Sequence, residues 1–217
     1  MMLKSQRKKA AATKPPPEID VYQETLNAAA KLFRKQGYAA TTLRQIGDAM
    51  GIQAGSIYYH FKSKEQILDK VLDAGIRVVL EEVRKRVDVL PADASCRERI
   101  EAAIEGHLVA LLQHGDFTSA NIRTYGQLPV GPRRRNGAIR AVYASYWDEL
   151  LEDGRKRGEL RGDINLAVLR PFVIGALNWT GEWIDPERGS LKKVIQQIAS
   201  IVFDGIVSHE AARARGR

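Results

Sequence analysis

Apolar residues recur at intervals of three and four along most of this 217-residue chain, and no stretch shows a strong alternation of apolar and polar side chains. Such spacing places apolar side chains on one face of an α-helix, whereas alternation would indicate β-strands. The stripe formed by Leu26, Ala29, Ala30 and Phe33 is the first example. The sequence therefore predicts an all-α fold.

Capping and turn residues mark where the helices start and end. Residues 42–45 (TLRQ) and 63–66 (SKEQ) have the pattern of a capping box, in which two side chains bind each other's backbone amides. Gly37 and Gly51 predict helix ends, because glycine readily adopts the left-handed conformation. The predicted helices span residues 19–36, 43–50, 54–60, 64–88, 96–113, 117–125, 135–157, 165–183 and 190–208. Pro171 falls inside the eighth, so we expect that helix to be kinked or to start later.

Composition bounds the class of protein. The single cysteine, Cys96, cannot form an internal disulfide, and no Cys/His spacing resembles a zinc site. The sequence contains neither the apolar run of a membrane span nor the pattern of a signal peptide. No nucleophile–base–acid arrangement or phosphate-binding glycine loop is recognisable. We therefore expect a cytoplasmic protein that is not an enzyme, does not span a membrane and carries no cofactor or metal.

Positive charge is concentrated at the N-terminus. Residues 1–17 contain five Lys and Arg residues and no acid, in a chain of net charge +8. Three prolines end this segment, and few of its residues are apolar. Burial of so little apolar surface cannot offset the entropy of ordering, so residues 1–18 are expected to form a disordered basic arm. Such an arm suits a polyanion such as DNA, although a solubilising terminus would have the same composition.

An aromatic cluster follows the second predicted helix. Residues 51–65 read GIQAGSIYYHFKSKE, in a chain otherwise poor in aromatics. Ile57 and Phe61 share one face of the short helix over 54–60, which leaves Tyr58 and Tyr59 pointing elsewhere. Two short helices joined by a glycine-containing turn form a helix-turn-helix, whose second helix enters the DNA major groove. The pattern predicts a DNA-binding surface at these tyrosines.

The same segment resembles a known family. Residues 38–68, YAATTLRQIGDAMGIQAGSIYYHFKSKEQIL, are similar to the DNA-binding segment of TetR-family transcriptional regulators, and the resemblance extends over residues 19–68. It implies an all-α homodimer. Residues 19–67 would form an N-terminal three-helix helix-turn-helix DNA-binding domain, and residues 68–217 a C-terminal helical domain for ligand binding and dimerisation.

The resemblance also assigns DNA contacts, at the start of the second helix, along the third and in the first turn of the fourth. Gln53, where the family varies, is a candidate for reading bases. The predicted DNA-binding residues are Thr42, Arg44, Gln53, Gly55, Ser56, Tyr58, Tyr59, His60 and Lys64. Other roles stay open for three of them: Tyr58 can be a partly buried core residue, His60 can cap a helix, and Arg44 can be a solvated charge.

Large side chains gather on the predicted inward faces of the helices between residues 100 and 183. Such a set can line a ligand pocket or fill an ordinary core. The predicted ligand-binding residues are Leu108, Phe117, Arg123, Tyr125, Tyr143, Tyr146, Trp147, Arg170, Leu177, Trp179 and Trp183. His107 and His114 are seven residues apart on one helical face, but no third ligand is nearby to complete a metal site.

Residues 147–183 are similar to the C-terminal domains of TetR regulators that respond to acyl-CoA thioesters, notably in Gly-Ala-Leu-Asn-Trp followed by a second tryptophan. A thioester needs an apolar tunnel for its acyl chain and cations or indoles for its nucleotide. In the last predicted helix, a broad apolar stripe from Leu191 to Ile206 suits pairing with a second copy.

These features predict a dimeric repressor that binds double-stranded DNA at a palindromic operator and is released by an acyl-CoA or similar amphipathic effector. Two recognition helices about 34–36 Å apart would enter successive major grooves. The long helix over 64–88 joins both halves and is the expected lever. Two alternatives stay open: a drug- or lipophile-responsive regulator of efflux, and a ligand-independent DNA-binding structural protein.

Overall fold

The computed structural model describes residues 20–204, apart from 127, 129 and 185–189. Over this part of the chain the fold is helical and contains no strand, which confirms the all-α prediction. The elements are α1 (Val21–Gln36), α2 (Leu43–Met50), α3 (Ala54–His60), α4 (Lys64–Val87), α5 (Cys96–Gln113), α6 (Gly115–Tyr125), α7 (Val130–Lys156), α8 (Leu166–Trp179), the short 3₁₀ helix η1 (Thr180–Glu182) and α9 (Leu191–Asp204).

Capping confirms one predicted helix start fully and the other in part. The Thr42 hydroxyl accepts from the Gln45 N–H at 3.2 Å, and the Gln45 side-chain oxygen accepts from the Thr42 N–H at 2.8 Å. At α4, Ser63 accepts from the Gln66 N–H at 3.2 Å, but the Gln66 side chain accepts from the Lys62 N–H at 2.7 Å instead of closing the box. The second predicted capping box is therefore incomplete: the Gln66 side chain binds the amide of Lys62 and not that of the N-cap residue Ser63.

Several predicted boundaries are wrong by a few residues. Helix α7 starts at Val130 and not at 135, since Pro132 lies in its first turn, where its missing N–H costs nothing. Helix α6 starts at Gly115, two residues early. Helix α8 starts at Leu166, one residue after the predicted start, and continues through Pro171, so the alternative of a start beyond Pro171 is wrong. It gives way to η1 at Thr180, short of the predicted end, and residues 205–208 of the last predicted helix lie outside the described part.

Two helices end at a glycine, as predicted, but the two glycines differ in backbone conformation. Gly51 adopts the left-handed conformation after α2, with φ 69° and ψ 25°. Gly37 has a positive φ of 82° but an extended ψ of 163°, so it ends α1 without the predicted left-handed helical turn. Its N–H still donates to the Phe33 carbonyl at 3.0 Å.

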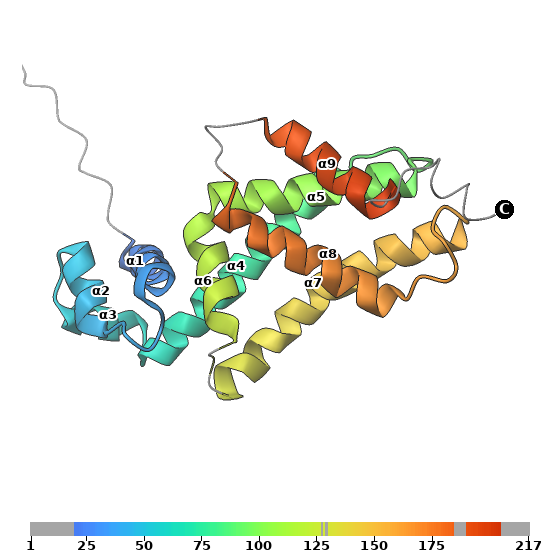
Figure 1. Cartoon of the computed structure of the whole chain (residues 1–217). Coiled ribbons are helices and arrows are strands. Elements are labelled where there is room, and N and C mark those ends of the chain that lie inside the picture. The colour runs from blue at the N-terminus through green and yellow to red at the C-terminus, as the bar shows by residue number, and fades with distance from the viewer. Residues whose placement is uncertain (1–19, 127, 129, 185–189, 205–217) are drawn as a thin grey trace, which may run out of the picture.

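Helix α4 connects two apolar clusters. Helices α1, α2 and α3 lie together at one end of the molecule, and α4 leads from them into the larger helical half (Figure 1). The N-terminal cluster consists of Leu26, Ala29, Ala30, Phe33, Ile46, Ile57, Phe61, Ile67, Leu68, Val71 and Leu72, with Ala120 of α6 and Leu128. The second cluster begins on α4 at Ile76 and includes side chains from α5, α7, α8 and α9. One continuous helix therefore belongs to both cores.

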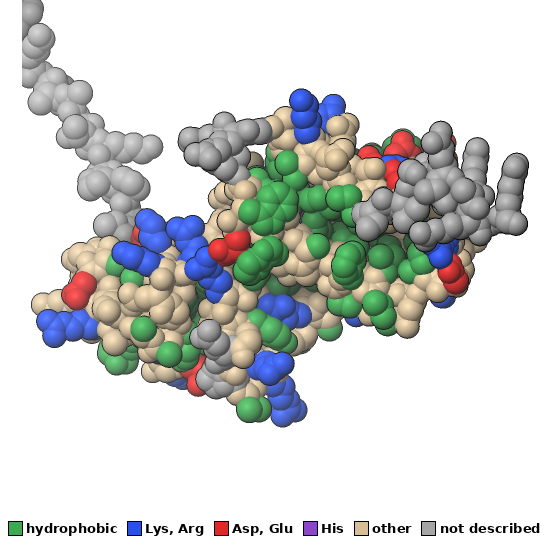
Figure 2. All heavy atoms as spheres, viewed as in Figure 1, with side chains coloured by type: hydrophobic (Ala, Val, Ile, Leu, Met, Phe, Trp, Pro, Cys, Tyr) green, Lys and Arg blue, Asp and Glu red, His purple; other side chains and the backbone are tan. Residues whose placement is uncertain are grey.

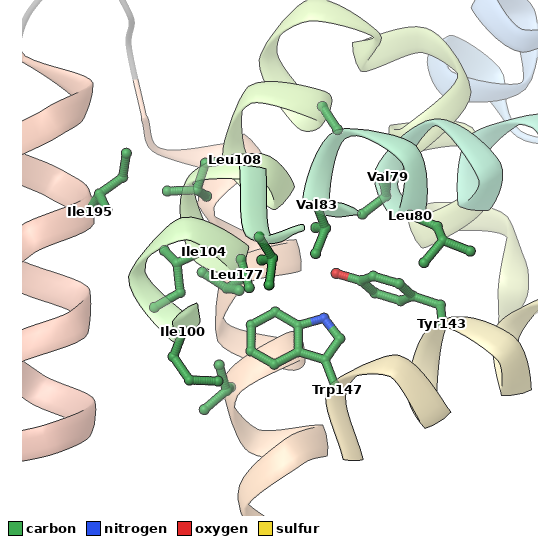
Figure 3. Close-up of a cluster of buried hydrophobic side chains, with 14 of the residues drawn as sticks. Val79, Leu80, Val83, Ile100, Ile104, Leu108, Tyr143, Trp147, Leu177 and Ile195 are labelled. Carbon is green, nitrogen blue, oxygen red and sulfur yellow. The ribbon is translucent and has the colours of Figure 1, made fainter. Parts of the chain in front are cut away.

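The larger half is built around close packing on α4, which contacts α5, α6 and α7. Gly106 of α5 lies against the α4 backbone, and a Cβ at this position would be 2.6 Å from the Glu82 carbonyl oxygen. Only glycine permits this approach without displacing a helix. Ile100, Ile104 and Leu108 of α5 belong to the same apolar cluster as the buried Trp147 of α7 (Figure 3).

Candidate DNA-binding surface and effector cavity

The outer faces of α2 and α3 carry most of the predicted DNA contacts. Ile46, Ile57 and Phe61 are buried against α1 and α4, which turns the other face of α3 to solvent. Tyr59 is 89% exposed and Tyr58 is 58% exposed, so the core role that was open for Tyr58 is excluded. Large aromatics this exposed, on a rigid short helix, are unusual unless they bind a partner.

The two glycines of the helix-turn-helix are required for different reasons. A Cβ on Gly47 would lie 2.8 Å from the Ile52 carbonyl oxygen, so glycine lets α2 and α3 pack closely. A Cβ on Gly55 would meet no atom of the described chain within 4 Å, and its φ is not positive. Neither packing nor backbone conformation explains Gly55, and the open space beside it is compatible with its predicted place in a DNA-contacting surface.

The remaining predicted contacts occupy distinct environments on this surface. Gln53, Ser56 and His60 are exposed, and the His60 ring lies edge-on to Tyr59 with ring centroids 5.1 Å apart. Arg44 is exposed, with its guanidinium 4.0 Å from the carboxylate of Asp48. This separation is long and the pair is solvated, so Arg44 is available to a phosphate. Thr42 is exposed as well, but its hydroxyl caps α2.

Lys64 is placed differently from the other predicted DNA contacts. Its ammonium donates to the carbonyls of Tyr38 at 2.8 Å and Thr41 at 2.5 Å, and it lies 4.3 Å from the centre of the Tyr38 ring. Partial burial lowers the pKa of this amine. Lys64 thus ties the start of α4 to the α1–α2 connection, and its predicted phosphate contact is left with one free N–H.

A cavity of about 300 Å³ lies in the larger half, between α4, α5, α6, α7 and α8. Its walls are lined by Gly75, Ile76, Val79, His107, Leu111, Thr118, Asn121, Ile122, Arg140, Tyr143, Ala144, Arg170, Pro171, Ile174, Gly175 and Asn178. The lining is mostly apolar with a few convergent polar groups, which is typical of a small-molecule site. Tyr143 and Arg170 are the predicted ligand-binding residues that the structure places on it.

Other predicted ligand residues lie in the packed interior. Leu108, Trp147 and Leu177 are fully buried in the second cluster, behind the cavity wall. Phe117 and Tyr125 pack against the N-terminal cluster. Leu108, Trp147 and Leu177 therefore match the core alternative, because other side chains already remove their apolar area from water. Phe117 and Tyr125 are partly buried and do not line the cavity.

Four further predicted ligand residues lie at the surface or in polar contacts. Trp179 and Trp183 are 65% and 57% exposed, so their predicted inward orientation is wrong: they occupy the outer side of α8 and the residue after η1. Arg123 pairs with Glu182 at 2.7 Å. The Tyr146 hydroxyl donates to Asp88 at 2.8 Å, and burial together with this carboxylate raises its pKa.

Arg140 is the most informative cavity residue that the predicted ligand set lacks. Its Nε donates to the Asn136 side-chain oxygen at 3.0 Å, its Nη2 donates to Asn121, and its guanidinium lies 3.6 Å from the centre of the Tyr125 ring. No carboxylate among the described residues lies within ion-pair distance of it. Burial lowers its pKa. A cation without a counter-ion in a cavity wall favours an anionic ligand.

The second polar group is buried deeper. Nδ1 of His107 is 2.7 Å from the Tyr143 hydroxyl, and both residues are almost completely buried. Burial lowers the pKa of His107 to about 4, while the nearby Asn178 side chain opposes this shift. The imidazole is therefore neutral at pH 7. Burial also raises the pKa of Tyr143, whose hydroxyl faces the indole nitrogen of Trp147 (Figure 3).

These cavity residues were hard to find from the sequence. Arg140 is not in the predicted ligand-binding set, and the sequence pattern singles out His107 only as a possible metal ligand with His114. Among the described residues, no group of three His, Cys, Asp or Glu side chains could hold a metal ion. Asn121 and Asn178 carry no sequence signal, because a single amide on a helix has many possible roles.

Contacts through α6 connect the cavity with the DNA-binding end. Asn121, which binds Arg140, also donates from its amide nitrogen to the Leu72 carbonyl of α4 at 2.8 Å. Near the start of the same helix, Asp116 pairs with Arg34 of α1 at 2.9 Å. Helix α6 thus contacts the cavity, the connecting helix and the N-terminal unit at once.

A third candidate surface lies on α8. Figure 2 shows hydrophobic side chains gathered along α8 and between α8 and α9. The large exposed apolar residues of this face are Val168, Phe172, Trp179, Trp183 and Ile201. The predicted apolar stripe of α9 is only partly available, because Ile195 and Ala199 are buried against the chain's own α5. An apolar face of this kind marks an interaction site.

Membrane insertion finds no support in the described helices, since none of them is long and apolar enough to cross a bilayer.

Comparison with known proteins gives matches over both halves of the chain. Residues 26–71 match the model of bacterial regulatory proteins of the tetR family, and residues 93–206 match the tetracyclin repressor-like C-terminal domain. The HTH-type transcriptional repressor KstR2 of Rhodococcus jostii is 29% identical over 206 residues, which cover 89% of this chain and 98% of the relative.

Solved structures give the same picture. The ketosteroid transcriptional regulator KstR2 of Mycobacterium tuberculosis superposes with a TM-score of 0.73 at 26% identity, over 88% of this chain and 97% of that one. FadR of Bacillus subtilis, solved in complex with stearoyl-CoA, has a TM-score of 0.72 at 20% identity, over 86% of this chain and 100% of that one. The second likeness shows the fold alone.

Proposed function

This chain belongs to the TetR family of bacterial regulatory proteins, and we propose that it is a homodimeric repressor released from a palindromic operator by an acyl-CoA or similar amphipathic anion. One observation carries the effector side of this proposal. The cavity shares a wall with α4, the helix that starts in the N-terminal core, and Arg140 presents an uncompensated positive charge to it.

Operator binding is supported by the outward face of α3. Tyr58, Tyr59 and His60 are exposed there, and Gly55 leaves room for a phosphate backbone to approach. Hydroxyl and backbone groups of such a helix bind phosphates, while Gln53 at its N-terminal end is placed to read a base edge. A repressor role follows the named relative, which is a transcriptional repressor.

Dimerisation is supported by the exposed apolar face of α8. Phe172 and Trp179 are each about two-thirds exposed, and they lie two turns apart on one face of this helix. Pairing of this face with its copy, together with the outer side of α9, would bury these side chains in a four-helix arrangement. A symmetric dimer holds two α3 helices in fixed register, which an inverted-repeat operator requires.

The charge of the effector follows from the cavity. A lipophilic cation would be repelled by Arg140, because no Asp or Glu among the described residues lines the cavity. The other cavity arginine, Arg170, is already paired with Asp148 at 2.8 Å. An anionic group can form a charge-assisted hydrogen bond with Arg140, while the apolar part of the same ligand packs against the apolar walls. The cavity volume, about 300 Å³, lies at the small end of ligand sites, so we assign it to an acyl group with its carboxylate or thioester carbonyl, either of which can accept from Arg140, and not to a whole coenzyme.

Release would result from different effector affinities of two dimer conformations. An effector that binds Arg140 competes with Asn121, whose amide holds α6 to the Leu72 carbonyl of α4. A shift of α6 along α4 would also move Asp116, which pairs with Arg34 of α1. If the conformation preferred by the effector holds the two α3 helices at the wrong spacing, operator affinity falls by the same factor as effector affinity.

The test starts from an operator selected by the purified full chain from random DNA. Decanoyl-CoA should release the protein from this operator, and the lipophilic cation tetraphenylphosphonium should not. Arg140→Gln should weaken release by decanoyl-CoA, while Arg134→Gln, at an exposed position of the same helix, is the matched control. Release by the cation alone would overturn the effector class and favour a drug-responsive regulator.

A further inference from the structure

The deep end of the cavity contains a hydrogen-bonding atom that the protein leaves unused. His107 is 1% exposed, and its Nε2 has no hydrogen-bond partner among the described protein atoms. The other ring nitrogen, Nδ1, is occupied by the Tyr143 hydroxyl at 2.7 Å. A buried polar atom without a partner costs free energy of folding. Because both residues line the cavity, a ligand is the natural partner for Nε2.

The surroundings indicate which ring nitrogen bears the proton. The indole N–H of Trp147 is a donor only, it is buried without an acceptor at hydrogen-bonding distance, and it faces the Tyr143 hydroxyl oxygen (Figure 3). This arrangement directs the hydroxyl proton of Tyr143 toward Nδ1 of His107. In a neutral imidazole, an accepting Nδ1 requires that Nε2 carries the hydrogen. His107 then offers a donor to the cavity.

Asn178 of α8 lies on the same side of the cavity and is near the imidazole. Nε2 of His107 has no partner among the described residues within hydrogen-bonding distance, so the side-chain amide of Asn178, which has both a donor and an acceptor, stays available to a ligand beside it. Arg140, in contrast, is one helical turn before Tyr143 on α7, which is about 5 Å along the helix axis. The cavity therefore has two polar groups, one neutral and donating at His107, the other cationic at Arg140, with apolar walls from Ile76 and Ile174 among others.

We propose that the acyl part of the effector carries a carbonyl oxygen remote from its acid or thioester end, and that His107 Nε2–H and Asn178 bind this oxygen while Arg140 binds the acid or thioester end. This inference rests on the proposed effector class and narrows it from acyl groups in general to oxygenated ones. A saturated acyl chain without this oxygen can pack against the apolar walls, but it leaves the Nε2–H of His107 without an acceptor.

The discriminating experiment compares matched ligands by calorimetry on the full chain. The probes are decanoyl-CoA and its 5-, 7- and 9-oxo derivatives, together with the corresponding free acids. At least one oxo derivative should bind about 10-fold or more tightly than decanoyl-CoA, because a site with a buried donor discriminates against a ligand that cannot pair it. Equal affinity of all four thioesters would overturn the inference and leave the effector class intact.

Variants assign the preference to a residue. His107→Leu should abolish the preference for the oxo ligand, while Arg140→Gln should weaken all ligands by a similar factor and keep the preference. If His107→Leu does not fold, Tyr143→Phe serves in its place: it removes the hydroxyl that holds the ring tautomer, and it should reduce the preference. An unchanged preference in a folded His107→Leu or in Tyr143→Phe would contradict the assignment.

The free acids separate the two proposals. If oxo acids bind with a preference that depends on His107 and no thioester binds, the coenzyme part of the proposed effector fails and the carbonyl site stands. If neither acids nor thioesters bind, both proposals fail. Nitrogen-15 chemical shifts of His107 give an independent reading, because a protonated Nε2 and an unprotonated Nδ1 are expected before any ligand is added.

Discussion

The two ends of this molecule use their side chains in opposite directions. At the DNA-binding end, Ile57 and Phe61 fill a closed core and leave Tyr58 and Tyr59 outside. In the larger half, the informative groups face inward, and Nε2 of His107, in the cavity wall, is buried without a hydrogen-bond partner among the described residues. A surface that binds a large rigid polyanion needs exposed groups on a stable support, whereas a site for a small ligand needs a core that is incompletely filled and incompletely paired. The predictions below test that contrast.

The largest expected effect is the acid sensitivity of the inward-facing histidine. His107 has a pKa of about 4 in the folded chain, against about 6.5 when unfolded. The unfolded state therefore binds more protons between these values, and the free energy of unfolding falls as pH drops from about 6.5 to 4. We expect His107 to contribute a loss on the order of 3 kcal/mol, measured by urea unfolding at a series of pH values.

Two substitutions make this measurement specific. His107→Gln should show a smaller loss of stability in acid than the native chain. His60→Gln, which changes an exposed histidine at the DNA-binding end, should follow the native chain. Identical acid profiles for all three proteins would show that the buried imidazole is paired or solvated, and the inward-facing half of the comparison would fail.

The second prediction concerns two glycines eight residues apart. Gly47→Ala should lower the free energy of unfolding by about 1–3 kcal/mol, because the added Cβ meets the Ile52 carbonyl oxygen. Gly55→Ala meets no protein atom and should leave stability unchanged or raise it by up to about 1 kcal/mol, yet weaken operator binding. Thermal unfolding and fluorescence anisotropy give the two quantities. Native operator affinity in Gly55→Ala would remove the support for close DNA approach at α3.

Tyr59 and Lys64 contrast an outward with an inward group within the DNA-binding end. Tyr59→Ala should leave the unfolding free energy unchanged and weaken operator binding by about 1 kcal/mol, since its side chain is 89% exposed. Lys64→Met should instead destabilise the fold by about 1–2 kcal/mol, through loss of its bonds to the Tyr38 and Thr41 carbonyls.

The salt dependence of operator affinity then decides the predicted phosphate contact of Lys64. A lost phosphate contact makes the slope of log K against log salt shallower by about 0.9. An unchanged slope with a lower stability would leave Lys64 with a positioning role only. Full stability of Lys64→Met would contradict the role that the structure gives to its ammonium.

The sequence predicts the DNA-binding end better than the cavity, because the first depends on local signals and the second on packing between distant helices. The helix-turn-helix depends on local signals, namely the Thr42 cap, the turn glycines and the aromatic run, so both its helices and its exposed face were predictable. The prediction that Trp179 and Trp183 point inward is wrong because periodicity identifies an apolar face without saying what covers it. Arg140 and His107 line the same cavity only because five helices pack around it. The residues next to each of them in the sequence give no sign of this arrangement.

The smallest expected effect is at the contact between the two ends. Arg34 and Asp116 form a partly exposed ion pair at 2.9 Å, so Arg34→Ala should reduce stability by less than about 1 kcal/mol. It should nevertheless reduce the effect of effector on operator affinity, because α6 loses its link to α1. A double-mutant cycle with Asp116→Ala isolates the pair. Undiminished effector response in both variants would show that coupling runs through α4 alone.

The measurement that tests the central claim most directly is reciprocal linkage. Operator affinity is measured with and without saturating effector, using the tightest of the acyl-CoA probes, and effector affinity is measured with and without saturating operator. The account predicts that each ligand weakens the other by the same factor, of about 10–100. An effector that occupies the cavity and leaves operator affinity unchanged would contradict it.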